Sequence, residues 1–147
     1  MPGLKSLTVK ENSNLTSLSG IENLSNLKLL YAQNNKLTSL SGIEKLTNLN
    51  ELSAPFNEIV NADSLSGLKK LIWIDLAANK LSRLPDLRHL ANLGRSSYFA
   101  GNELTREKLI AKMPAYLVDL LSLHGEREWL DRQLLDVNMY LYDRFHY

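Results

Sequence analysis

The sequence predicts an α/β solenoid, in which short parallel strands line a concave side and irregular or 3₁₀ turns form the convex side. Two observations carry this prediction. Apolar residues recur in one pattern from Leu27 to Leu49 to Leu71, each 22 residues after the last, and an asparagine recurs in the same phase. A fixed period of about 20 to 50 residues is typical of proteins whose repeats stack in a row.

Three consecutive rounds of this pattern follow one another without a gap. A degenerate round precedes them and a decaying round follows, and each of these is one residue longer. The recurring positions in the five rounds are Leu4, Leu7, Val9, Leu15, Leu18, Ile21 and Leu24, then Leu27, Leu30, Ala32, Asn35, Leu37, Leu40, Ile43 and Leu46, then Leu49, Leu52, Ala54, Asn57, Ile59, Ala62, Leu65 and Leu68, then Leu71, Ile74, Leu76, Asn79, Leu81, Leu84, Leu87 and Leu90, and last Leu93, Ser97, Phe99, Asn102 and Leu104.

One asparagine in each round is expected to hold the turn that follows the strand. The backbone turns sharply there, and its polar groups become buried between neighbouring coils. An amide side chain both donates and accepts hydrogen bonds, so it can satisfy them. We therefore interpret Asn35, Asn57, Asn79 and Asn102 as structural residues rather than ligand-binding groups.

The second half of each round is expected to return as a 3₁₀ or irregular turn. Ser-Gly occurs at 19–20 and again at 41–42, and Pro85-Asp86 takes the same phase later. Such short segments rich in turn-forming residues favour this conformation over a full helix.

The phrases "LTSLSGIEKLTNL" and "LPDLRHLANL" carry a family resemblance over residues 4–104. The pattern L-x-x-L-x-L-x-x-N-x-L resembles the leucine-rich repeat. Rounds of this length look like the internalins and related bacterial surface repeats, and they are also similar to the phosphatase-regulatory class of short eukaryotic repeats. The resemblance implies a curved, non-catalytic scaffold that binds another macromolecule. No N-terminal cap, immunoglobulin-like module or wall-sorting signal is visible beside it.

We therefore expect two parts: a solenoid of about five repeats over residues 1–104 and a helical C-terminal cap over residues 105–147. Thr105 is the expected helix N-cap and Pro114 the expected stop. A later apolar stripe at helical spacing starts at Trp129. This segment is expected to seal the last coil; docking a partner or a neighbouring domain is the alternative.

The concave face is the candidate partner-binding surface, because strand side chains that point away from the core line it. Large apolar or amphipathic groups are expected to be exposed there, with acidic neighbours, and such aromatic groups are enriched at interface hot spots. By phase, one column is Ser6, Leu29, Glu51, Trp73 and Ser96, and the next is Thr8, Tyr31, Ser53, Asp75 and Tyr98. The candidate residues are Leu29, Tyr31, Glu51, Phe56, Trp73, Asp75 and Tyr98. The alternatives are ordinary packing of a shallow sheet and a cover by the C-terminal helices.

A second candidate surface is the N-terminal edge, which includes Leu4, Leu7 and Leu15. Terminal repeats need a polar outer face, or part of the core is open to water. The chain is expected to be the C-terminal part of a longer solenoid. Otherwise a second copy or a partner covers this edge.

Composition excludes several other functions. The chain has no cysteine, so disulfides, thiol catalysis and cysteine-type zinc sites are excluded. A formal net charge of +1 lacks the electrostatic footprint of nucleic-acid binding. No apolar run is long enough to span a membrane. His124 and Glu128 lie four residues apart without an evident third ligand, so no metal, cofactor or catalytic site is expected.

The sequence thus predicts a non-catalytic module that binds another protein. Our first hypothesis is that the chain is part of a bacterial internalin-like protein, secreted or at the cell surface. The alternative is a cytoplasmic adaptor or regulatory subunit that positions an enzyme such as a phosphatase.

Overall fold

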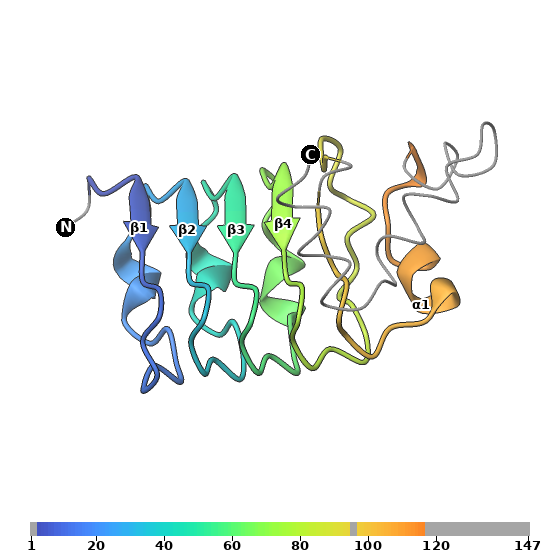
Figure 1. The fold of residues 1–147 in the computed structure, drawn as a ribbon. Coiled ribbons are helices and arrows are strands. Elements are labelled where there is room, and N and C mark those ends of the chain that lie inside the picture. The colour runs from blue at the N-terminus through green and yellow to red at the C-terminus, as the bar shows by residue number, and fades with distance from the viewer. Residues whose placement is uncertain (1–2, 95–96, 117–147) are drawn as a thin grey trace, which may run out of the picture.

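The computed structural model is a row of stacked coils whose strands form one parallel sheet (Figure 1). It describes residues 3–94 and 97–116. The strands are β1 (Ser6–Thr8), β2 (Leu29–Tyr31), β3 (Glu51–Ser53) and β4 (Trp73–Asp75), and they lie in chain order. The predicted fold class, a leucine-rich-repeat solenoid, is confirmed.

Three short 3₁₀ turns form the opposite side of the row, as the sequence predicts. They are η1 (Ile21–Asn23), η2 (Ile43–Lys45) and η3 (Asp63–Leu65), and Figure 1 shows them behind the strands. Gly42 precedes η2 with φ 106°, and a Cβ atom there would lie 3.3 Å from the carbonyl oxygen of Leu18. This turn therefore needs a glycine for both its backbone angle and its close approach to the previous coil.

A glutamate fixes each of the first two turns, which the sequence pattern did not predict. Glu22 Oε2 accepts the N–H of Gly20 at 2.8 Å, and Glu44 Oε2 accepts that of Gly42 at 2.7 Å. Backbone N–H groups, its own first and that of Gly42 second, hold the pKa of the Glu44 carboxyl below its ordinary value. These hydrogen bonds satisfy backbone donors at the start of each turn.

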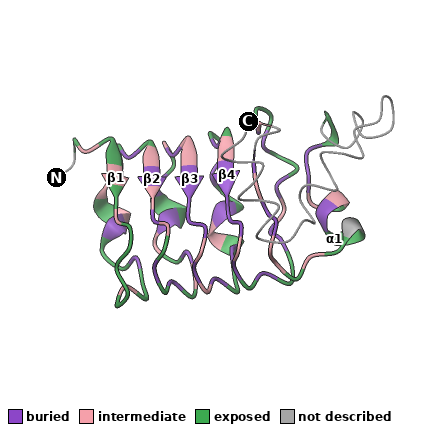
Figure 2. Cartoon of the chain, in the orientation of Figure 1, coloured by how far each residue is buried: buried purple, intermediate pink, exposed green. Residues whose placement is uncertain are grey.

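The core is a stack of apolar side chains, one layer from each coil. Leu7, Leu30, Leu52 and Ile74 stand in register at the centre of the four strands. All but Leu7 are fully buried, and Figure 2 shows burial increasing from β1 towards β4. Because each layer covers the next, a coil in the middle of the row loses nearly all of its apolar surface to its neighbours.

The predicted asparagine ladder is confirmed, and Asn57 shows its geometry. Its Nδ2 donates to the carbonyl oxygens of Ala32, Ala54 and Pro55 at 2.9, 3.1 and 3.3 Å. Its Oδ1 accepts the N–H of Leu37 at 3.1 Å. Ala32 and Leu37 belong to the preceding coil, so one amide closes its own turn and ties it to its neighbour.

The same bonds recur along the row. Asn79 donates to Ala54 O of the preceding coil at 3.0 Å and accepts the N–H of Ile59. Asn102 repeats the pattern with Leu76 O and the N–H of Leu81, at 2.8 and 2.9 Å. Asn35 donates to Val9 O at 2.7 Å and accepts the N–H of Asn12. Each ladder amide thus links two coils.

A left-handed residue stands immediately before each of these asparagines. Asn34, Phe56 and Ala78 have φ values of 58°, 57° and 54°, and Gly101 has 72°. Glycine and asparagine tolerate this conformation, whereas at Phe56 and Ala78 it costs about 1–2 kcal/mol. The stacking of the coils and the amide hydrogen bonds maintain this conformation.

The first and last coils are each one residue longer than the two between them, as predicted. Asp75 pairs with Tyr98, 23 positions later, through an isolated bridge. Ser97 takes the core position that leucine or isoleucine holds elsewhere, and its Oγ accepts the N–H of Ile74 at 3.1 Å. A buried hydroxyl is tolerated there because this bond satisfies it.

The helix α1 (Arg106–Ile110) lies at the end of the row beyond β4 (Figure 1). Thr105 is its N-cap, as predicted, and its Oγ1 accepts the N–H of Lys108 at 3.3 Å. Leu109 and Met113 are 0% and 2% exposed and join the core. The helix ends before Pro114, which we expected to stop it. The later stripe that starts at Trp129 lies outside the described residues.

Replacing a ladder asparagine should strongly destabilise the solenoid. Asn57→Ala leaves the buried N–H of Leu37 without its acceptor and removes one of the two donors to each of three carbonyl oxygens, so we expect the free energy of unfolding to fall by about 3 kcal/mol. Urea denaturation followed by circular dichroism measures this loss. The matched control is Asn23→Ala, an exposed amide, which should change stability by less than about 0.5 kcal/mol. If both variants lost the same free energy of unfolding, the asparagine ladder would not be what stabilises the turn.

Replacing Ala78 with glycine should stabilise the chain. Relief of the left-handed conformation outweighs the added entropy of the unfolded state, and we expect a gain of about 0.5–1 kcal/mol. The control is Ala54→Gly, at a position whose φ is not positive, where the same change should destabilise. Thermal unfolding of both variants tests the difference in sign.

Candidate partner-binding surface

The strand register aligns the residues of the two predicted columns, although Ser53 and Asp75 in the second column are buried. Leu29, Glu51 and Trp73 pair in the first column, and Tyr31, Ser53 and Asp75 pair in the second. Tyr98 continues the second column through its bridge to Asp75. Ser96, expected in the first column, lies outside the described residues.

The candidate residues differ in exposure, and one expectation is wrong. Six of the seven candidates are half-buried. Five lie on the strands or beside them, and the sixth, Phe56, lies just beyond β3. The five are Leu29, Tyr31, Glu51, Trp73 and Tyr98. Asp75, expected as an exposed acidic neighbour, is 0% exposed. Its Oδ1 accepts the N–H of Ala77 at 3.2 Å, so the carboxylate turns back onto its own backbone instead of facing outward.

Tyr31 and Glu51 form a direct contact between neighbouring strands. The Tyr31 hydroxyl donates to Glu51 Oε2 at 2.6 Å. This hydrogen bond, with burial and the carboxylate charge adding to it, raises the pKa of the Tyr31 phenol above its ordinary value. Near neutral pH the phenol therefore stays protonated and fixes the position of the carboxylate. The repeat phase predicts both residues on this face, but it does not predict their contact.

Phe56 and Tyr98 lie at the edge of the concave face, Phe56 beyond the end of β3 and Tyr98 beside the last residue of β4. Both are half-buried and pack against a small cluster formed by Ala77 and Ala100. This cluster is separate from the main core. Phe56 and Tyr98 come from different coils. Because Ala77 and Ala100 are small, both aromatic rings can pack against the same two residues.

The N-terminal edge exposes part of the core, as the sequence analysis predicted. Leu4, Leu7 and Leu15 are only half-buried and pack against the core from its open end. The N–H groups of Val9 and Glu11 donate to the coil that contains β2. By the alternation of a strand, the backbone groups of every second residue along this edge, such as Lys10 between them, point away from the sheet, as on any edge strand.

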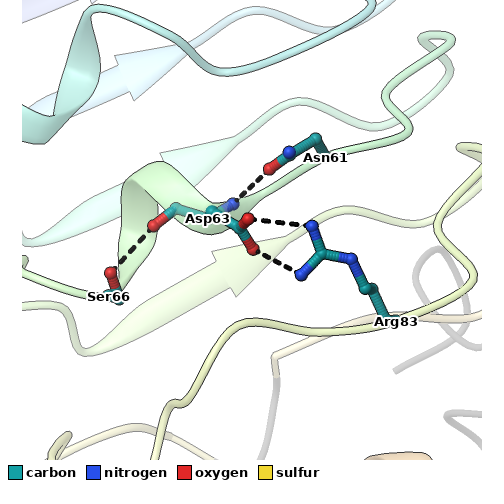
Figure 3. A network of polar contacts seen from close by, with 4 residues as sticks. All are labelled: Asn61, Asp63, Ser66 and Arg83. Atoms are coloured by element: carbon teal, nitrogen blue, oxygen red, sulfur yellow. Dashed lines mark hydrogen bonds and ion pairs between the residues drawn. The ribbon is translucent and has the colours of Figure 1, made fainter.

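A polar network joins the third and fourth coils on the outside of the solenoid (Figure 3). Arg83 binds both carboxylate oxygens of Asp63 at 3.0 and 2.9 Å. The N–H of Asp63 donates to Asn61 Oδ1, and its carbonyl accepts from Ser66 Oγ. Both charged side chains are more than half exposed. This pair adds modestly to stability and is already satisfied, so we assign it a structural role.

The described part of the chain holds no group of three or more acidic, histidine or cysteine side chains that could bind a metal ion. His89 is exposed there, and the pair His124 and Glu128 lies outside the described residues. Among the described helices, none has both the length and the apolar character needed to cross a membrane.

Solved structures show what this arrangement is similar to. An internalin C2 from Listeria monocytogenes is 32% identical, with 67% of this chain and 43% of that chain covered and a TM-score of 0.59. A leucine-rich-repeat protein from Leptospira interrogans is 28% identical, with 82% and 30% covered and a TM-score of 0.66. The chain is an internalin-like leucine-rich-repeat protein.

A third similar structure is the functional domain of InlJ from Listeria monocytogenes, which includes a cysteine ladder. It is 29% identical, with 71% of this chain and 22% of that chain covered and a TM-score of 0.62. The internalin-like chain has no cysteine, and asparagines form the ladder described above. It spans less than half the length of each of these three structures. No protein-family model and no curated protein sequence matches it.

The contact between Tyr31 and Glu51 makes a titration prediction. The pKa of Tyr31 is raised in the folded state, so its contribution to stability is present below the ordinary value of about 10 and is lost as the pH rises through the raised value. Glu51→Gln should lower the pKa of Tyr31, because it weakens the hydrogen bond that the phenol donates to the carboxylate and also removes the negative charge. Ultraviolet titration of the phenol, compared with Tyr31→Phe to assign the signal, measures this. An unchanged pKa in Glu51→Gln would contradict the assigned cause.

Proposed function

We propose that this protein is a non-catalytic interaction module that binds another protein through its concave face. One observation carries the proposal: large apolar, aromatic and acidic side chains gather on the strands, with Leu29, Glu51 and Trp73 in one register column and Tyr31 bonded to Glu51 from the next column. Aromatic side chains of this kind contribute much of the affinity at protein interfaces.

The rigidity of the solenoid supports this function. The ladder of asparagines and the register of the strands fix the backbone under each concave side chain. A surface ordered before binding loses less conformational entropy when a partner docks, so more of the contact energy appears as affinity.

The proposed non-catalytic role agrees with the similar structures, which are leucine-rich-repeat proteins. We further propose that the chain is part of a bacterial internalin-like protein, secreted or at the cell surface. The Listeria and Leptospira structures favour this role over the intracellular adaptor. The proposed cap over residues 105–147 is supported by Leu109 and Met113, which pack against the last coil.

Replacing Tyr31 and Trp73 together with alanine should abolish partner binding and leave the fold intact. The probe is a displayed library of random peptides, selected on the wild-type chain and then tested on the variant. We expect most selected clones to lose at least about tenfold in affinity. The matched control is Val60→Ala, an exposed apolar residue outside the strands, which should leave binding unchanged.

Two results would contradict this proposal. Clones that bind the double variant as tightly as the wild type would place the binding surface elsewhere. The same conclusion would follow if Val60→Ala removed binding and the double variant did not. Circular dichroism of each variant checks that the fold is retained.

Self-association through the N-terminal edge stays a prediction. If a second copy covers Leu4, Leu7 and Leu15, sedimentation equilibrium should show a dimer that Leu15→Lys dissociates. Backbone N–H groups of residues 6–8 should then exchange slowly with solvent. A monomer with fast exchange at these residues would rule this association out.

A further inference from the structure

We propose that Glu51 is the centre of a subsite on the concave face that accepts a basic side chain, lysine or arginine, of the protein partner. This inference rests on the proposed function and names the chemistry of the partner. It follows from the charge of the strand surface, the hydrogen bonding of the carboxylate, and the side chains beside it.

The strand surface carries a single outward charge. The four strands together contain two acidic residues, Glu51 and Asp75, and no lysine or arginine. Asp75 is fully buried and turned onto the N–H of Ala77. Glu51 therefore supplies the charge that a partner meets on the strands, and it favours a cation.

Glu51 has no cation of its own in the described part of the chain. The ion pairs found there join Lys80 to Glu58, Arg83 to Asp63, and Arg88 to Asp86. A basic residue does lie close along the backbone, because the N–H of Glu51 donates to Lys28 O at 3.0 Å. The Lys28 ammonium nevertheless forms no ion pair with the carboxylate in this region.

The hydrogen bond from Tyr31 prepares the carboxylate for a second donor. It engages Oε2 at 2.6 Å, and within the described residues Oε1 accepts no hydrogen bond. Half-burial removes part of the water around the carboxylate, and a charged donor can replace that hydration. Hydrogen bonds between a cation and a carboxylate are about twice as strong as neutral ones.

The neighbours of Glu51 suit the rest of a basic side chain. Leu29 and Trp73 stand in register on either side, about 4.8 Å away along the sheet. Tyr31 lies diagonally across from it. A long aliphatic stem can pack on the apolar groups, and a cation beside an aromatic face gains a further attraction.

The other described carboxylates do not combine these features. Glu22 and Glu44 accept backbone N–H groups of the convex turns. Asp63 and Asp86 are already bound to arginines. Glu103 is exposed and lies outside the strands, so it serves as a matched control.

The test is a nuclear magnetic resonance titration with two small probes, Nα-acetyl-lysine N-methylamide and its uncharged norleucine analogue. We expect saturable shifts at Leu29, Tyr31 and Glu51 with the lysine probe alone. Glu51→Gln should weaken binding by about tenfold or more, and Glu103→Gln should leave it unchanged. About 0.5 M salt should also weaken it. The spectrum of each variant shows whether it is folded.

Three results would overturn the subsite: equal shifts with norleucine, equal binding by Glu51→Gln, or shifts spread over all exposed carboxylates. The displayed peptides separate this failure from that of the proposed function. Clones that lose binding to the Tyr31 and Trp73 double variant but not to Glu51→Gln would keep the concave face and reject the subsite. Clones indifferent to both changes would reject the proposed function itself.

Discussion

The amide ladder is the constraint on which the rest of this structure depends. Each round must reverse direction while its backbone is covered by coils on both sides, and uncompensated burial of those groups costs about 1–3 kcal/mol each. An asparagine such as Asn57 meets three carbonyls and one N–H with a single side chain. With the turn fixed, the strand before it holds its register and the leucines of successive coils come into layers.

The same constraint explains why strained residues are tolerated along one line of the molecule. Phe56 and Ala78 keep a left-handed backbone immediately before ladder asparagines. Neither residue type prefers that conformation, yet the neighbouring coils leave the chain no other path. One strained position lies at the edge of the proposed binding surface, where Phe56 packs against Ala77 and Ala100.

Much of this architecture could be predicted from sequence, because residues that are one period apart occupy equivalent positions in neighbouring coils. The spacing of leucines placed Glu51 beside Trp73, and it placed Tyr98 beside Asp75 even in the stretched last round. Details set by side-chain rotation could not be predicted in this way. Local hydrogen bonds hold Asp75 to the N–H of Ala77 and Tyr31 to Glu51, and the spacing of the repeats does not predict them. The left-handed backbone of Ala78 could not be predicted either, since alanine is not a residue type that favours positive φ.

The proposed cap at one end of the row leaves the inner coils as the place where the molecule can change in length. Leu109 and Met113 pack against the last coil, whereas each inner coil packs only against coils of the same kind. Duplicating one 22-residue unit, such as the stretch from Leu49 to the residue before Leu71, would therefore leave both ends undisturbed. It would add one strand to the concave face. Gene duplication could thus widen the area offered to a partner without remaking the contacts already present.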